Sequence, residues 1–90
     1  MRFEADPAKA AQNLKKHKVS FEEAASVFGE SMAYPFPDPD HSVGDERWLT
    51  FGMSRMGRIL AIIFIERRGT IRLISARVAT KHERSIYEEG

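Results

Sequence analysis

The chain has 90 residues, no cysteine and a formal net charge of +1, and 42% of its residues are hydrophobic. This length predicts one domain over residues 1–90, with enough apolar side chains for one core but not for a deep metabolite pocket. The lack of cysteine excludes disulfides and thiolate metal sites and fits a reducing cytoplasm, and no apolar run is long enough for a signal peptide or a membrane span.

Two helices are predicted in the first third of the chain, over about 7–16 and 21–28. Asp6 is a good N-cap for the first helix, and Pro7 suits the first helical position because it lacks an N–H group. Ser20, followed three residues later by a glutamate, has the spacing of a capping box and starts the second helix.

The second half of the chain predicts a β-meander. An uninterrupted apolar run over 59–65 is typical of a central strand, and alternation of apolar and polar residues follows it. The three main strands are expected at 47–53, 58–66 and 70–78, with weaker edge strands at 2–4 and 32–36. A capping-box spacing from Thr80 to Glu83 opens a C-terminal helix. The predicted fold class is therefore α+β, an antiparallel sheet packed with two N-terminal helices and one C-terminal helix.

A polar segment rich in proline and aspartate, 37–46, separates the first edge strand from the meander. Asp38, Asp40 and His41 could be metal ligands, but a single imidazole among carboxylates placed next to prolines is more typical of turns. The sequence contains no motif for nucleotide or metal chemistry. We therefore expect no metal and no cofactor.

The distribution of charge says more than its sum. Six of the 14 basic residues fall near the C-terminus: Arg67, Arg68, Arg72, Arg77, Lys81 and Arg84. A basic face on a nearly neutral protein indicates a localised anionic ligand, and the alternative is an ordinary solvated surface.

Arg77 lies at the end of the last predicted strand, just before the C-terminal helix. A phosphate could be held there by the guanidinium and by the amides of the helix start. The alternative is that Arg77 pairs with Glu83 or with a loop carboxylate. Arg72 and Arg77 have opposite parity, so both can serve one site only if a bulge or the strand end intervenes.

A basic surface that carries histidine suits metal-free cleavage of RNA. The 2′-hydroxyl of RNA is the attacking group, so the protein need only supply a base, an acid and positive charge for the phosphate. Composition and spacing alone do not establish this activity.

The opening stretch FEADPAKAAQNLKKHKVSFEEAASVF resembles the start of the BrnT toxins of bacterial type II toxin–antitoxin systems. The loop FPDPDHSVGDERW and the ending IRLISARVATKHERSIYEE are also similar to this family. Within the opening stretch the family pattern is matched at Phe3, Glu4, Asp6, Lys9, Asn13, Lys16, His17, Val19, Phe21, Glu23 and Ala24.

This resemblance implies a RelE-like ribonuclease fold and a cytoplasmic toxin that cleaves RNA and blocks translation. It also implies neutralisation by a BrnA antitoxin, which is a ribbon-helix-helix dimer. The toxin itself would contact operator DNA only through this antitoxin. By the resemblance, the catalytic residues would be Arg77, Arg72, His17 and Glu66, and Lys16 would bind RNA. From the basic face, Arg67 and Lys81 are expected as further RNA-binding residues.

Four positions depart from the family pattern: Ala5, Lys18, Phe64 and Val78. Lys18 stands where glycine is common, and Val78 stands where a basic residue is frequent. An alternative reading is therefore a weakened toxin homologue that acts as an antitoxin-binding co-repressor. An independent DNA-binding domain is disfavoured, because the second predicted helix carries no basic residue. Candidate antitoxin contacts are Trp48, Tyr34 and Phe36, each of which could instead belong to the core.

Overall fold

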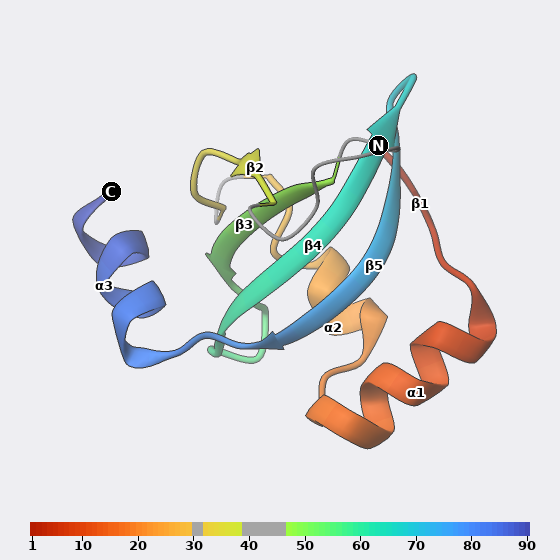
Figure 1. Cartoon of the computed structure of the whole chain (residues 1–90), viewed down its shortest axis with the longest axis horizontal. Coiled ribbons are helices and arrows are strands. Elements are labelled where there is room, and N and C mark those ends of the chain that lie inside the picture. Colours follow the sequence, from red (N-terminus) through yellow and green to blue (C-terminus); the bar gives the residue numbers. More distant parts are fainter. Residues whose placement is uncertain (30–31, 39–46) are drawn as a thin grey trace.

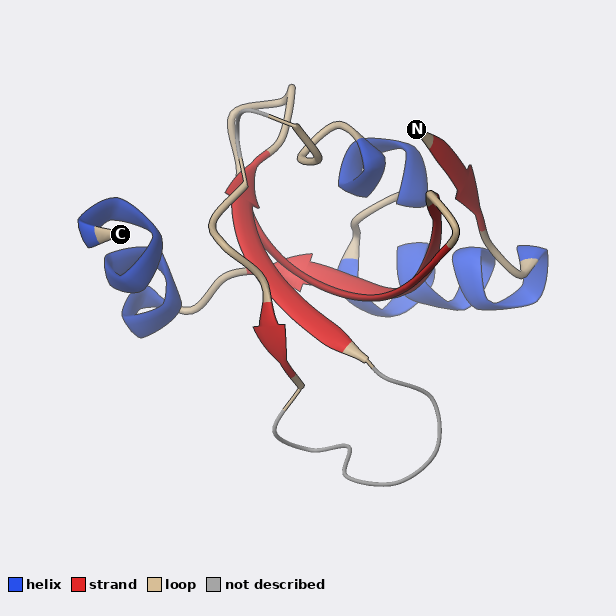
Figure 2. Ribbon diagram, turned by 90° about the horizontal axis from the view of Figure 1, so that it is seen from above, coloured by secondary structure: helices blue, strands red, loops and turns tan. Residues whose placement is uncertain are grey.

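The computed structural model describes residues 1–29, 32–38 and 47–90. Within these ranges the chain forms an α+β fold, as predicted, with the sheet order β1-β5-β4-β3-β2 (Figure 1). Helices α1 and α2 lie together on one side of the curved sheet, and α3 lies apart from them (Figure 2). The elements are β1 (Arg2–Glu4), α1 (Pro7–His17), α2 (Phe21–Ala25), β2 (Phe36–Pro37), β3 (Trp48–Met53), β4 (Ile59–Arg67), β5 (Thr70–Val78) and α3 (Lys81–Glu89).

The predicted meander is present, since β4 pairs antiparallel with both β3 and β5. Strand β1 runs parallel to β5, so the sheet is mixed and not wholly antiparallel as expected. The expected strand at 32–36 is reduced to an isolated bridge between Met32 and Gly52 and the two-residue β2. Pro35 and Pro37 limit it, because proline has no N–H group for a ladder.

The helix starts follow the predicted caps with one exception. In α3, Thr80 and Glu83 form the reciprocal capping box. At α2, the Ser20 hydroxyl accepts from the Glu23 amide at 3.0 Å, but the Glu23 side chain is used elsewhere. Helix α2 is also shorter than expected, and ends at Ala25. Among the described residues, no helix is both long and apolar enough to cross a bilayer.

The two faces of the sheet carry separate apolar clusters. The larger lies under α1 and α2 and includes Leu60, Ile62 and Phe64 with the α2 side chains. Phe64 packs edge-on against Phe28 with ring centroids 5.0 Å apart, so this departure from the family pattern is a core residue. The smaller cluster, on the opposite face, consists of Leu49, Phe51 and Ala61, with Ala33, Phe36, Ile63 and Tyr87 packed against it.

The other departures from the family pattern and the three aromatic candidates for the antitoxin contact differ in their burial. Ala5 and Trp48 are partly buried against the larger cluster, whereas Phe36 packs on the smaller one. Tyr34 is 94% exposed, and Val78 is 42% exposed at the end of β5. Tyr34 is therefore the aromatic side chain of the three that is free to make an intermolecular contact.

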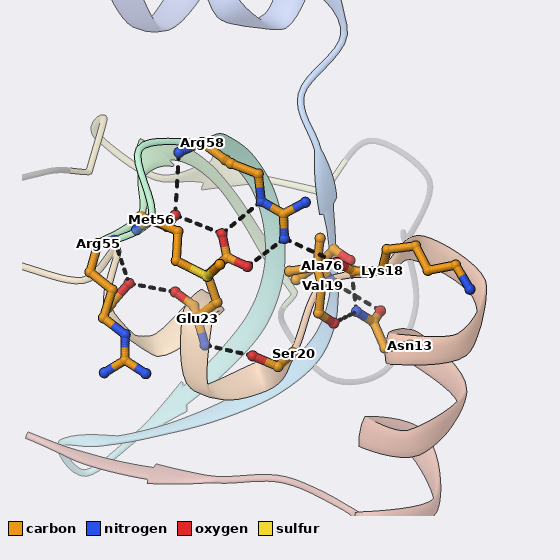
Figure 3. Close-up of polar contacts among 11 residues, drawn as sticks. Asn13, Lys18, Val19, Ser20, Glu23, Arg55, Met56, Arg58 and Ala76 are labelled. Atoms are coloured by element: carbon orange, nitrogen blue, oxygen red, sulfur yellow. Dashed lines mark hydrogen bonds and ion pairs between the residues drawn. The ribbon is translucent and has the colours of Figure 1, made fainter.

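An ion pair between the buried Glu23 and the partly exposed Arg58 joins α2 to the β3–β4 turn (Figure 3). The Glu23 carboxylate accepts from Arg58 Nε at 2.9 Å and from the Ser54 hydroxyl at 2.7 Å. Arg58 Nη2 also donates to the Lys18 carbonyl at 3.0 Å. The hydrogen bond from Arg58 outweighs burial and lowers the pKa of Glu23, so this carboxylate stays charged although it is buried.

Asn13 ties helix α1 to the edge of β5 (Figure 3). Its Nδ2 donates to the carbonyls of Val19 at 2.9 Å and Ala76 at 2.8 Å, and its Oδ1 accepts from the Ala76 amide at 3.1 Å. The side-chain amide thus satisfies backbone groups that β1 does not reach, because β1 pairs with β5 only at 70–72.

Replacing Asn13 with alanine should therefore lower the free energy of unfolding by about 2–4 kcal/mol, because three buried backbone groups lose their partner. Denaturant unfolding measures this loss. The neighbouring Gln12→Ala, at an exposed position of the same helix, should change stability by no more than about 0.5 kcal/mol. Equal effects of the two substitutions would contradict this role for Asn13.

Lys18 ends α1 in the left-handed conformation, with φ 59° and ψ 31°. A side chain disfavours this conformation, which explains why glycine suits the position. We expect Lys18→Gly to raise the unfolding free energy by about 0.5–1 kcal/mol. Lys15→Gly, inside the same helix, should lower it by about 1 kcal/mol. If both substitutions destabilise the protein alike in thermal and denaturant unfolding, the strain at Lys18 is not significant.

Candidate functional site

A β-bulge in β5 decides which side chains share a face. Ile63 pairs with Ser75 while Phe64 pairs with Leu73, so Ile74 has no partner on β4. The alternation of side chains therefore shifts by one residue at Ile74. As a consequence Arg72 and Arg77 lie on the same face of the sheet, in spite of their opposite parity, and this face is opposite to α1 and α2.

This face has two different ends. At the end of β5, Tyr87 of α3 packs on the smaller apolar cluster and closes the surface. At the other end a cleft of about 410 Å³ lies over the start of β5 and the end of β4. The described residues that line this cationic cleft are Glu4, Lys9, Arg47, Ile65, Arg67, Thr70, Arg72 and Ile74.

The cationic cleft is rich in donors. Arg72 Nη1 lies 3.3 Å from the Glu4 carboxylate, but both side chains are about half exposed, so this ion pair contributes little and is easily exchanged. Arg47 is partly buried, and its Nε is the one buried side-chain nitrogen or oxygen without a hydrogen-bond partner in the described part of the chain. A buried donor without a partner is costly, and an anionic oxygen would satisfy it.

Arg77 is held differently. Its Nη1 and Nη2 donate to the two carboxylate oxygens of Glu83 at 2.6 and 2.8 Å, which is the alternative that the sequence left open. The Arg77 guanidinium, together with the Thr80 amide, lowers the pKa of Glu83 to about 2. This pair fixes the start of α3 against β5 and neutralises the charge of Arg77 in the described structure.

Lys16 and His17 lie in a second, shallower depression along the edge of β5. It is lined by one stripe of α1, Lys9, Gln12, Asn13, Lys16 and His17, together with Ile74. Lys9 and Ile74 line both depressions, so the two depressions are continuous. His17 therefore lies on a surface that extends into the cationic cleft.

The other predicted site residues are scattered. Arg67 lines the cationic cleft, whereas Lys81 is an exposed residue at the start of α3. Glu66 pairs with Ile71 and therefore lies on the face of α1 and α2, away from Arg72. Whether any of these side chains acts in catalysis stays a prediction.

Two basic residues of the cleft, Lys9 and Arg47, were not assigned a role in the site from the sequence, although Lys9 matches the family pattern. Arg47 immediately precedes β3, and Lys9 is an exposed position of α1, so the three-dimensional fold brings them together. Among the described residues no group of three or more His, Asp or Glu side chains could hold a metal. Asp38 is buried, and the suggested ligands Asp40 and His41 lie outside the described residues.

The fold and the cleft together define a small α+β protein with a cationic surface suited to a phosphate-bearing ligand. The chain is similar to the crystal structure of the Brucella abortus ribonuclease toxin BrnT, with 25% sequence identity and a TM-score of 0.63. The match covers 90% of this chain and 99% of that chain. None of the curated proteins matches the chain.

The model of the family described as the ribonuclease toxin BrnT of type II toxin–antitoxin systems matches residues 6–83. The chain belongs to this family. It is therefore an endoribonuclease toxin, and a cognate antitoxin partner follows from its class. The α+β fold and the family implied by the sequence resemblance are thereby confirmed.

The Arg77–Glu83 pair predicts a specific acid sensitivity. Because the folded-state pKa of Glu83 is lowered from 4.5 to about 2, its stabilising contribution is complete above pH 4.5 and is lost as the pH falls toward 2. The wild type should lose roughly 1–2 kcal/mol more than Glu83→Gln across this interval, after allowance for the partly exposed arginine. Unfolding at a series of pH values measures this difference. The surface variant Glu89→Gln should follow the wild type, and parallel curves for wild type and Glu83→Gln would contradict the assignment.

Proposed function

We propose that the cationic cleft binds the scissile phosphate of RNA and that the protein cleaves the strand without a metal ion. The observation that carries this proposal is the convergence of Lys9, Arg47 and Arg72 around one cleft in which a buried guanidinium nitrogen lacks a partner. Guanidinium groups match the geometry of phosphate oxygens and favour the extra negative charge of the transition state.

The reaction needs little from the protein beyond position and charge. The 2′-hydroxyl loses its proton to a base and attacks the adjacent phosphorus, and the bond to the 5′-oxygen breaks as that oxygen takes up a proton. The products are a 2′,3′-cyclic phosphate and a 5′-hydroxyl end. Arg72, whose exposed contact with Glu4 is weak, would move onto a phosphate oxygen, and Arg47 would donate its Nε from the cleft wall.

His17 is the candidate for proton transfer, because it lies in the depression that shares Lys9 and Ile74 with the cleft. Imidazole is the commonest general acid or base in such reactions. Lys16, in the same depression, and Arg67, in the cleft, would bind flanking phosphates. Arg77 faces the same side, but it would have to leave Glu83 before it could contact RNA.

The biological setting that we propose follows the family. Cleavage of messenger RNA in the cytoplasm would block translation, and an antitoxin of the BrnA type would neutralise the toxin. Contact with operator DNA would then occur only through the ribbon-helix-helix domain of that antitoxin. The 94% exposed Tyr34 is a described side chain available for the antitoxin contact.

Arg72→Ala should reduce kcat for RNA cleavage by about 10²–10³ fold, because one donor to the transition-state phosphate is lost. The measurement is cleavage of a labelled oligoribonucleotide by purified protein in EDTA, with analysis of the product ends. Arg84→Ala, which removes one positive charge from α3, should retain activity within about twofold, since exposed charges far from the site contribute little.

Arg77→Ala needs a stability measurement beside the activity assay, because loss of the pair with Glu83 destabilises α3. If its activity per folded molecule equals that of the wild type, Arg77 has a structural role alone. Full activity of Arg72→Ala, dependence on added metal, or 5′-phosphate ends would each contradict the proposed mechanism.

A further inference from the structure

A third depression lies on the opposite face of the sheet, at the same end as the cationic cleft. It has a volume of about 240 Å³ and is more apolar than the cleft. Its described lining residues are Tyr34, Pro35, Trp48, Phe64 and Glu66. Trp48 and Phe64 are cross-strand partners on β3 and β4, and Glu66 follows Phe64 by two residues, so all three point to the same side.

Among the described lining residues of this aromatic pocket, Glu66 supplies the one carboxylate, and Tyr34 and Trp48 each carry a further hydrogen-bonding group. Glu66 is exposed, and the nearby guanidinium groups of Arg47, Arg67 and Arg72 line the cleft on the other face. Tyr34 is 94% exposed, which is unusual for a tyrosine that only fills a core. Aromatic surfaces next to hydrogen-bonding groups are the arrangement with which proteins hold unstacked bases of single-stranded RNA.

The alternation of side chains connects the two sites. Arg47, immediately before β3, belongs to the cleft, and the next residue, Trp48, belongs to the aromatic pocket. Along β4, Ile65 and Arg67 belong to the cleft and Glu66 to the pocket. The two sites therefore lie back to back across the thickness of one sheet, at the same end of it.

We propose that the aromatic pocket binds one guanine base of the RNA substrate and thereby selects the cleavage site. This inference rests on the proposed function of the cationic cleft. The base stacks against Trp48 and Tyr34, and the Glu66 carboxylate accepts hydrogen bonds from the pairing edge of the base. Glu66 is thus a specificity residue on this assignment, in place of the catalytic role implied by the family resemblance.

Guanine fits because an ionised carboxylate can only accept hydrogen bonds. The pairing edge of guanine presents a ring N–H and an amino group side by side, which match the two carboxylate oxygens. Adenine and cytosine present one amino group beside an acceptor nitrogen, and uracil presents one N–H between two carbonyl oxygens. Each of these bases would place an acceptor against the carboxylate, which costs affinity.

The first test uses the only tryptophan of the chain as the probe. Binding of guanosine monophosphate should quench Trp48 fluorescence at concentrations about 10-fold or more below those needed for the adenosine, cytidine and uridine monophosphates. All four ligands carry the same phosphate, so the difference reports the base. Glu66→Gln should abolish this preference, and Glu89→Gln, which removes a carboxylate of α3, should keep it.

The second test maps cleavage on oligoribonucleotides that differ at one base. The wild type should cleave next to guanine with kcat/KM about 10-fold or more above the value for the same oligonucleotide with adenine at that position. Glu66→Gln should remove this ratio while it retains cleavage, whereas a catalytic role for Glu66 would make the variant inactive on both substrates. Arg72→Ala should lower cleavage of both substrates alike.

The outcomes separate this inference from the proposed function. Cleavage by the wild type without base preference, or equal quenching by the four nucleotides, would overturn the guanine pocket and leave the cationic cleft in place. Selective quenching by guanosine monophosphate in a protein that does not cleave RNA would support the pocket and overturn the proposed mechanism. Loss of all activity in Glu66→Gln with intact folding would overturn the specificity role.

Discussion

The side-chain amide of Asn13 is the contact on which the arrangement of the site depends. It holds the backbone of β5 at Ala76, two residues beyond the bulge at Ile74, and it also holds the start of α2 through the Val19 carbonyl. Because the backbone N–H and C=O of Ala76 both bond to Asn13, the second half of β5 cannot slide along its neighbour without losing buried hydrogen bonds. The position of α1 beside the cleft and the direction of Arg77 therefore have a common cause.

The face that carries Arg72 and Arg77 shows how one strand can serve two purposes. Near its end, Arg77 pairs with Glu83 and helps to dock α3, so its charge is neutralised within the protein. Near its start, Arg72 pairs with the exposed carboxylate of Glu4 and remains able to contact a ligand. The difference lies in the local partners and not in the residue type, since both are arginines on the same side of the same strand.

Local signals in the sequence were sufficient for most of the fold. The caps at Asp6 and Thr80 and the apolar run of β4 predict the helices and the meander, because each depends on residues close together in the chain. The capping box predicted at Ser20 forms only in part. The Ser20 hydroxyl caps the helix, but the Glu23 side chain pairs with Arg58, thirty-five residues away, and not with the helix start.

The site was less accessible from the sequence. Parity along β5 separates Arg72 from Arg77, and nothing at Ile74 marks the bulge that reunites them. The gathering of Lys9, Arg47 and Arg72 requires the sheet order and the path of α1, which are long-range properties. The resemblance to the family named Arg72 and Glu66 as catalytic residues, which stays a prediction, and it could not reveal that Glu66 faces away from Arg72.

The bulge at Ile74 also has a meaning for the gene. Loss of this one codon would restore strict alternation to β5. If the first half of the strand kept its buried side chains, the second half would then expose its own to the opposite face. Arg77 would turn toward Leu60 and Ile62, where a charge has no partner, and Ala76 would turn outward. An in-frame deletion here therefore destabilises the fold far more than most point substitutions. A compensating insertion of one residue in the same strand would be needed to restore the fold.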